Sequence, residues 1–361
     1  MSDKPYYERV FFKTCEPFIL DEYYKPKTNI FNILRYRISR FLGRSSRAPD
    51  YDFFWTTAIL ISGLHRMYES MGQEQAVDVI AGFFRKRFTE KEGFQEPLCL
   101  DSVMHGYALI KMYELNNISE YKRPINEMAK YLIEKHVKTS RGVLPYRSRM
   151  PEMVFIDTIG MVCPFLAYYG KIFDSEEATN LSVLQIKDFF EYGFDSNTGL
   201  PYHAYNSVTN EKKGCIGWGR GIGWIVYGVV DAIEHIPKSH PEYEKIIQRF
   251  RFFIDRLLQY QDENGYLKWQ VNDCNSHVDT SATSMFGYAL ARGVLLGILN
   301  EQCMLRAELC LAALENSTDV DGTVQDCSGE CIGLGKYSVE YGAYPWAQGP
   351  TLSLVAILKR E

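Results

Sequence analysis

The chain has 361 residues, of which 46% are hydrophobic and 24% charged, so it can bury a sizeable core and no segment has a disordered composition. Its formal net charge of -5 provides no general basic field, which argues against nucleic acid as a partner. An acidic ligand would have to be met by local cations.

The N-terminus lacks the basic and apolar regions of a secretory signal, and no apolar run is long enough to cross a bilayer. Nine cysteines, an odd number without a CxxC pair, argue against a secreted disulfide framework. Cys327 and Cys331 lack further ligands at metal-binding spacing, so we predict no metal site. We therefore expect a cytoplasmic protein that needs no cofactor.

Residues 1–50 are predicted to form an N-terminal extension that packs on a catalytic domain at 51–361. Within the extension, residues 29–47 place apolar side chains at helical spacing between arginines. Such a stretch is typical of a helix on a membrane or a partner, or of a surface helix with solvated arginines, and we favour the second interpretation. The arginines are Arg35, Arg37, Arg40, Arg44 and Arg47.

Further along the chain, one type of segment recurs about every 50 to 60 residues, a period typical of paired-helix repeats. Each copy opens with small or polar residues and continues into a helix that is apolar on nearly every side, which predicts complete burial. The copies begin at Asp52, Leu100, Ile156, Gly219, Asp279 and Gly349, and more amphipathic helices begin between them at Gln75, Ile125, Glu177, Glu242 and Glu301. This alternation predicts an all-α (α/α)6 barrel, whose sixth outer helix must come from the N-terminal region.

In such a barrel, the N-termini of the inner helices share one rim. Their unpaired backbone N–H groups and partial positive charge favour acidic side chains and anionic ligands there. Two long loops, at 139–153 and 195–218, enter the third and fourth inner helices. Because long ordered loops are often functional, we predict that they form the site.

Two aspartates stand where inner helices are predicted to begin, Asp101 in CLDSVMHG and Asp157 in FIDTIGMV. Aspartate is a favoured N-cap, and Asp52 and Asp279 occupy comparable places, so capping is the simpler interpretation of each residue alone. The apolar neighbours of Asp157, however, would desolvate its carboxyl group and favour the neutral, proton-donating form. Asp157 is therefore our principal catalytic candidate, with Asp101 nearby.

The segment GWGRGIGWIVYG carries Trp218, Arg220 and Trp224 among glycines that helix propensity does not favour. Arg220 can fork onto a carboxylate and the indole rings can stack on a sugar, although tight helix packing is an alternative reason for the glycines. His203, in a loop, could hydrogen-bond a substrate carboxylate or hydroxyl. No nucleophile elbow, phosphate loop, zinc motif or dinucleotide fingerprint is present, which leaves cofactor-free acid–base chemistry.

These motifs resemble the unsaturated glucuronyl and rhamnogalacturonyl hydrolases of glycoside hydrolase families 88 and 105, the latter more closely. The similarity runs from about residue 52 onward and is carried by IDTIGMVCPFLA, PYHAY, WGRGIGW and SATSMFGYALARG. It implies an (α/α)6 barrel with Asp157 as general acid/base and Asp101 as the second carboxylate. It also implies that His203, Arg220 and Trp224 bind the substrate.

By the same resemblance, the substrate is a small oligosaccharide that carries a 4,5-unsaturated uronic acid at its non-reducing end. The enzyme removes this sugar by hydrating its enol-ether double bond. Ile222 stands where the family pattern has Asn, and Trp55, Thr56 and Thr57 replace an aromatic–Asn–Gly signature, so some substrate contacts are expected to differ. We count Trp218 and Trp55 among the substrate-binding residues.

Other functions stay open, because a fold alone does not choose its chemistry. An (α/α)6 glycosidase or a sugar epimerase that acts on saturated sugars is one alternative. An epimerase should need suitably placed histidines, and most of the seven lie in predicted helices or away from the rim loops. An inactive carbohydrate-binding relative is the other alternative.

Overall fold

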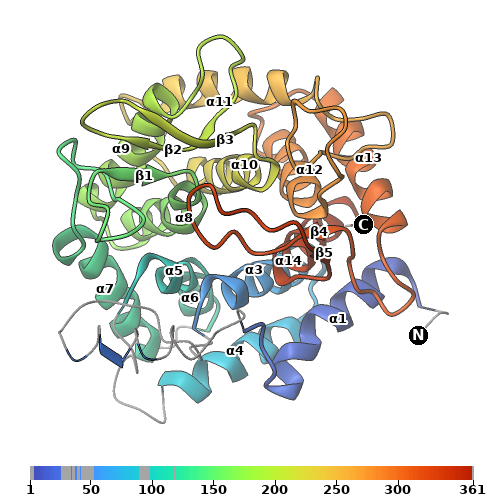
Figure 1. Cartoon of the computed structure of the whole chain (residues 1–361). Helices are drawn as coiled ribbons and strands as arrows, with labels where there is room; N and C mark the ends of the chain where they lie inside the picture. Colours follow the sequence, from blue (N-terminus) through green and yellow to red (C-terminus); the bar gives the residue numbers. More distant parts are fainter. Residues whose placement is uncertain are drawn as a thin grey trace.

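The computed structural model describes residues 4–25, 53–88, 98–116 and 119–359, together with residues 34, 37, 38 and 41. Over these ranges the chain forms two concentric rings of helices (Figure 1). The expected all-α (α/α)6 barrel is confirmed. Most of the basic stretch at 29–47, and Asp52, lie outside the described residues.

The inner ring consists of the helices that were predicted to be apolar on nearly every side. They are α3 (Trp55–Met71), α5 with α6 (Leu100–Val103 and His105–Asn116), α8 (Asp157–Ile172), α10 (Gly219–Ile233), α12 (Thr280–Leu295) and α14 (Pro345–Leu358). Contacts run from α3 through α14, α12, α10, α8 and α6 back to α3, so the ring is closed. Every residue of α10 is buried, as expected for a helix without a polar face.

The outer ring consists of amphipathic helices with one wet face. They are α1 (Tyr6–Leu20), α4 (Glu74–Phe88), η1 with α7 and η2 (Ser119–Tyr121, Lys122–Lys130 and Tyr131–Lys135), α9 (Glu176–Tyr192), α11 (Tyr243–Leu257) and α13 (Gln302–Asn316). Helix α1 packs on α14, where Gln348 Nε2 donates to the Val10 carbonyl at 3.3 Å. The N-terminal region thus supplies the sixth outer helix, while a domain boundary at residue 50 stays a prediction. None of the helices in the described ranges combines the length and hydropathy that a bilayer crossing requires.

The two long rim loops contain a small antiparallel sheet that the sequence analysis did not predict. Strands β1 (Met153–Phe155), β2 (Tyr202–Asn206) and β3 (Lys212–Ile216) pair in that order. A second pair, β4 (Cys327–Ser328) and β5 (Tyr341–Gly342), lies between α13 and α14. The alternation in YHAYN, followed by a turn and KKGCI, was the signal for the hairpin of β2 and β3.

The glycines of α10 serve the close packing of inner helices. A Cβ atom on Gly228 would lie 2.6 Å from the Cα atom of Gly160 in α8, and one on Gly223 would lie 2.7 Å from the Met285 sulfur in α12. Neither contact is sterically possible without movement. Helix packing, the alternative considered for these glycines, therefore accounts for both positions.

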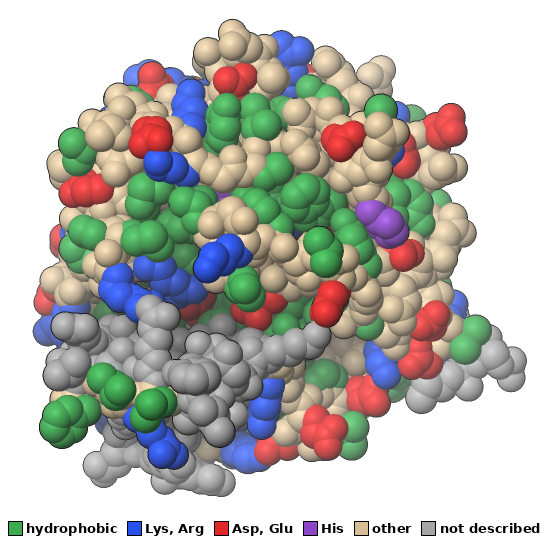
Figure 2. All heavy atoms as spheres, in the orientation of Figure 1, with side chains coloured by type: hydrophobic (Ala, Val, Ile, Leu, Met, Phe, Trp, Pro, Cys, Tyr) green, Lys and Arg blue, Asp and Glu red, His purple; other side chains and the backbone are tan. Residues whose placement is uncertain are grey.

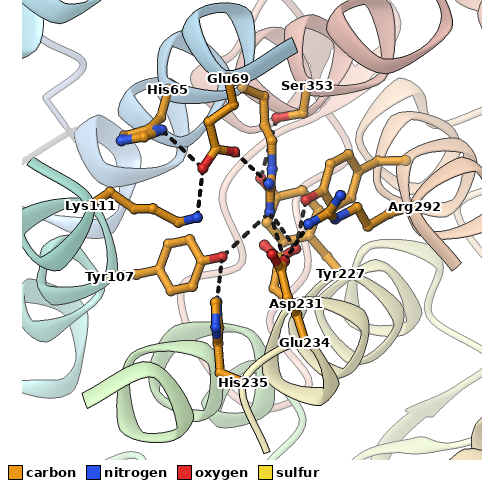
Figure 3. Close-up of polar contacts among 12 residues, drawn as sticks. His65, Glu69, Tyr107, Lys111, Tyr227, Asp231, Glu234, His235, Arg292 and Ser353 are labelled. Atoms are coloured by element: carbon orange, nitrogen blue, oxygen red, sulfur yellow. Dashed lines mark hydrogen bonds and ion pairs between the residues drawn. The ribbon is translucent and has the colours of Figure 1, made fainter. Parts of the chain in front are cut away.

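At the C-terminal ends of the inner helices, a buried network of charged side chains joins four helices (Figure 3). Arg66 of α3 contacts Asp231 of α10 at 2.9 Å and Glu69 at 2.5 Å. Lys111 of α6 contacts Glu69 at 2.6 Å, and Arg292 of α12 contacts Glu234 at 2.5 Å. Cations at these positions also offset the negative ends of the helix dipoles. The network ties together the end of the barrel opposite the rim.

Buried histidines make the fold sensitive to acid. Burial lowers the pKa of His65 to about 4 and the pKa values of His105 and His235 to about 3. The unfolded chain then binds more protons below pH 6.5, so stability falls as the pH drops toward 4. Each histidine contributes about 2 kcal/mol to this loss at pH 5.

We therefore expect the urea midpoint to fall steeply between pH 7 and pH 5. Replacement of His235 by Gln, which has no proton to gain, should flatten the dependence, whereas replacement of the exposed His277 should not. An equal pH dependence in the wild type and His235→Gln would contradict this prediction.

Candidate active site

Asp157 is the first residue of α8 and directly follows the sheet. Strand β1 pairs with β2, and the Ile156 N–H donates to the His203 carbonyl at 2.9 Å, so the start of α8 is fixed against His203. The N-cap of α8 is Ile156, so Asp157 is the first residue inside the helix and not its cap. Its Oδ2 atom is buried and has no hydrogen-bond partner among the described residues. The capping interpretation, which rested on the place of Asp157 at the start of a predicted inner helix, is therefore wrong for this residue.

His203 faces the Asp157 carboxyl group at the distance of a loose ion pair. His203 Nε2 lies 3.4 Å from Asp157 Oδ2, and the His203 side chain is 3% exposed against 14% for Asp157. The imidazole is packed edge-on to Phe155 at 5.2 Å and against Trp218 at 4.6 Å between ring centroids. The contact is longer than an ordinary hydrogen bond, and catalytic contacts often tighten only when substrate binds. The structure thus places the pair inside aromatic walls.

Asp101 lies in α5 and is fully buried. Its Oδ1 atom accepts a short hydrogen bond from the Tyr146 hydroxyl, and its Oδ2 atom accepts one from Arg147 at 2.6 Å. Tyr146 also packs against Phe155, with 5.6 Å between ring centroids, which connects this group to the surroundings of Asp157. Tyr146 and Arg147 come from the predicted site loop at 139–153, but neither was among the predicted site residues.

A strap, residues 327–342, crosses the mouth of the barrel in front of the inner helices (Figure 1). Ser328 fastens it to three of those helices. Arg220 donates to the Ser328 carbonyl at 2.7 Å and to the Gly329 carbonyl at 3.0 Å, and Trp346 donates to Ser328 at 2.9 Å. Asp279 accepts from the Ser328 hydroxyl at 2.6 Å and caps α12 through the Ser281 N–H, so capping is the correct interpretation for Asp279.

Both terminal nitrogens of Arg220 are thus bonded to the strap. Its side chain is buried, and its expected role as a fork for a substrate carboxylate stays a prediction. Arg147, which is paired with Asp101, is a second cation of the predicted site loop and is more accessible, because 38% of its side chain is exposed. Around the strap, hydrophobic side chains gather between scattered basic and acidic ones (Figure 2).

The three tryptophans predicted to bind sugar are all buried and lie in two groups. Trp218 is beside His203 at the mouth, with Arg220 stacked over its ring at 5.1 Å. Trp224 and Trp55 pack against each other, with 5.7 Å between ring centroids, and both are at most 6% exposed. The structure therefore brings Trp218 to His203, which faces Asp157, and places Trp55 and Trp224 in a separate aromatic cluster. Their sugar contacts stay predictions.

The two departures from the family pattern have internal contacts. Ile222 is fully buried in α10. Thr57 donates to the Phe54 carbonyl at 2.9 Å and lies 3.0 Å from His105 Nε2. Both side chains thus contribute to the barrel interior in this structure.

A closed (α/α)6 barrel with two carboxyl groups, a histidine and aromatic walls at its mouth defines a glycoside hydrolase of the six-hairpin class. The model of the family described as Glycosyl Hydrolase Family 88 matches residues 33–360, and the chain belongs to this family.

Similar curated proteins include the unsaturated rhamnogalacturonyl hydrolase YesR of Bacillus subtilis, which is 24% identical over 86% of this chain and 91% of its own length. An unsaturated 3S-rhamnoglycuronyl hydrolase of an Alteromonas species is 22% identical over 69% of this chain and 63% of its own.

Solved structures agree on the fold. A possible family 105 member from Klebsiella pneumoniae superposes with a TM-score of 0.83 at 17% identity, covering 98% of this chain and 92% of that one. The unsaturated glucuronyl hydrolase of a Bacillus species has a TM-score of 0.69 at 14% identity, covering 98% and 95%.

Proposed function

We propose that this hydrolase removes a 4,5-unsaturated uronic acid from the non-reducing end of an oligosaccharide, with Asp157 as its general acid and base. The family and the names of its relatives support the reaction. One structural observation carries the assignment of the acid. Among the inner-helix aspartates that the structure describes, Asp101 and Asp279 accept hydrogen bonds from loop residues, whereas Asp157 Oδ2 is buried without a hydrogen-bond partner.

The chemistry requires one proton to be delivered and later recovered. The Asp157 carboxyl group protonates C4, the electron pair of the C4–C5 double bond forms the new C–H bond, and the ring oxygen stabilises the cation at C5. Water then adds at C5 and returns a proton to the Asp157 carboxylate. The resulting hemiketal opens by cleavage of the bond between C5 and the ring oxygen, and the remaining hemiacetal at C1 releases the rest of the chain. This route differs from direct attack at the anomeric centre.

The neighbouring residues have distinct tasks in this proposal. His203 faces Asp157 and orients its carboxyl group, while Trp218 supports the imidazole and bounds the sugar site. Asp101, held by Tyr146 and Arg147, supplies a fixed negative charge near the developing cation.

We place the protein in the cytoplasm, since all nine cysteines are free thiols.

Incubation with unsaturated disaccharides tests the function. Hydration destroys the conjugated enol-ether uronate, so its ultraviolet absorbance should disappear in step with release of the second sugar. The matched saturated disaccharides should remain intact. Cleavage of the saturated compounds alone would favour an ordinary glycosidase, and isomerisation without release would favour an epimerase.

Arg147 should bind the uronate carboxylate, because its guanidinium lies beside Asp101 and its side chain is 38% exposed. We expect Arg147→Gln to raise KM for an unsaturated uronide about tenfold, with a smaller change in kcat. Arg149→Gln, an exposed arginine of the same loop, is the matched control and should leave both constants unchanged. An unchanged KM in Arg147→Gln would contradict the role.

A further inference from the structure

Tyr337 of the strap reaches the ring nitrogen of His203 that does not face Asp157. The Tyr337 hydroxyl lies 2.9 Å from His203 Nδ1 and accepts a hydrogen bond from the Cys215 N–H of β3 at 2.8 Å. Its ring is held between Trp218 and Trp269, each with 5.4 Å between centroids. The hydroxyl is therefore fixed at the junction of the strap, the sheet and the histidine.

The fit around this hydroxyl is tight. Gly214, next to Cys215, has a φ of +82°, and a Cβ atom there would lie 2.7 Å from the His203 Cβ and 2.8 Å from the Tyr337 hydroxyl oxygen. Any other residue at position 214 would push the strand away from both side chains. Glycine at this position permits the contact between Cys215, Tyr337 and His203.

The protons that Tyr337 and its two partners carry determine which group donates in each of these hydrogen bonds. A tyrosine hydroxyl has one proton to donate and can accept through its lone pairs. Burial raises the pKa of Tyr337, so the phenol keeps its proton. The Cys215 N–H can only donate, and the acceptor that the structure offers to the phenol proton is His203 Nδ1. An imidazole whose Nδ1 accepts carries its proton on Nε2.

We propose that Tyr337 is a positioning residue that fixes His203 in the tautomer with the proton on Nε2, directed at Asp157 Oδ2. A hydrogen-bond chain then runs from the Cys215 N–H through the Tyr337 hydroxyl to His203 Nδ1, and His203 Nε2 faces Asp157 Oδ2 at 3.4 Å. The strap thereby completes the active site through one hydroxyl group. The two hydrogen bonds that fix the tautomer are present without substrate, and the 3.4 Å contact with Asp157 is the one that should shorten to a hydrogen bond when substrate binds.

The tautomer also selects the oxygen of Asp157 that donates, a consequence that rests on the proposed function. When Asp157 is neutral, Oδ2 accepts from His203 and the acidic proton resides on Oδ1. That proton passes from Oδ1 to C4 of the unsaturated sugar, and Oδ1 afterwards takes a proton from the attacking water. The Nε2–H bond persists through both steps, so His203 orients the carboxyl group and exchanges no proton.

Nitrogen NMR of the histidine-labelled full chain tests the tautomer directly. In the wild type at neutral pH, we expect the His203 signals to show a bare, hydrogen-bonded Nδ1 and a protonated Nε2. The His203 signals are assigned as those that disappear in His203→Gln. A proton on Nδ1, or on both nitrogens, would overturn the proposal. Because no substrate is present, this result is independent of whether the proposed reaction is correct.

Tyr337→Phe supplies the second measurement. The variant should populate both tautomers of His203 and lower kcat on an unsaturated disaccharide about tenfold, the equivalent of one hydrogen bond, with little change in KM. Tyr341→Phe is the matched control, since Tyr341 lies on the same strap and stacks on His277 at 4.1 Å, away from His203. Unchanged tautomers and kcat in Tyr337→Phe would overturn the role of Tyr337. If that variant fails to fold, the wild-type spectrum still decides.

Discussion

Asp157→Asn is expected to lower kcat on an unsaturated disaccharide by on the order of 1,000-fold while leaving the fold intact. An amide cannot donate the proton that C4 must receive, and general acids contribute about 100- to 10,000-fold to such steps. Stability should change little, because Asp157 is not the N-cap of α8 and its Oδ2 atom has no hydrogen-bond partner among the described residues. Initial rates of absorbance loss and thermal melting would check both parts.

Asp279→Asn is the matched control for this experiment. Asp279 also stands at the start of an inner helix, but it accepts hydrogen bonds from Ser281 and from the Ser328 hydroxyl at 2.6 Å. An amide in its place cannot accept from all of these donors, so the melting temperature should fall by several degrees. Full turnover by Asp157→Asn would refute the catalytic assignment, whatever the control shows.

Arg66→Met is expected to destabilise the fold by about 3–5 kcal/mol, because it leaves buried carboxylates without their main counter-ion. The Arg66 side chain is 6% exposed and pairs with both Glu69 and Asp231. Burial raises the pKa of Asp231, although Arg66 opposes that shift. Glu234 depends on the same charge, since Arg66 and Arg292 outweigh burial and lower its pKa to about 2. Urea unfolding at pH 7.5 would measure the loss.

An exposed ion pair provides the comparison for Arg66. Arg249 contacts Glu191 at 2.5 Å, but their side chains are 42% and 50% exposed, so Arg249→Met should cost less than about 1 kcal/mol. Equal losses in the two variants would show that burial does not determine the strength of the network. The active site lies at the other end of the barrel, so folded Arg66→Met should retain its turnover.

The rings of helices could be predicted from the sequence because burial on every side leaves a local pattern in each inner helix. The sheet was missed because its strands have at most five residues, too few for their alternation to stand out. Local sequence also could not distinguish the roles of the aspartates that stand near the starts of inner helices. Asp279 proves to be the N-cap of α12, whereas Asp157 is the first residue inside α8, and Ser328, far along the chain, hydrogen-bonds to Asp279 and not to Asp157.

The candidate site was predictable where its residues lie in motifs and not where tertiary contacts define it. Asp157, His203 and Trp218 do come together as expected. Arg147 lies in a predicted site loop, but its contact with Asp101 spans 46 residues. Tyr337 reaches His203 across 134 residues. No local pattern reports such contacts, because their geometry is set by the closure of the barrel and by the path of the strap.

The most direct test of the proposed mechanism is to follow the proton that is added at C4 of the unsaturated sugar. In deuterated buffer, the wild type should place one deuterium on a single face of C4, detected by NMR at early times before exchange scrambles the label. The double bond should disappear at the same rate, and Asp157→Asn should do neither. Release of the terminal sugar with the double bond still intact, or without deuterium at C4, would contradict proton delivery by Asp157.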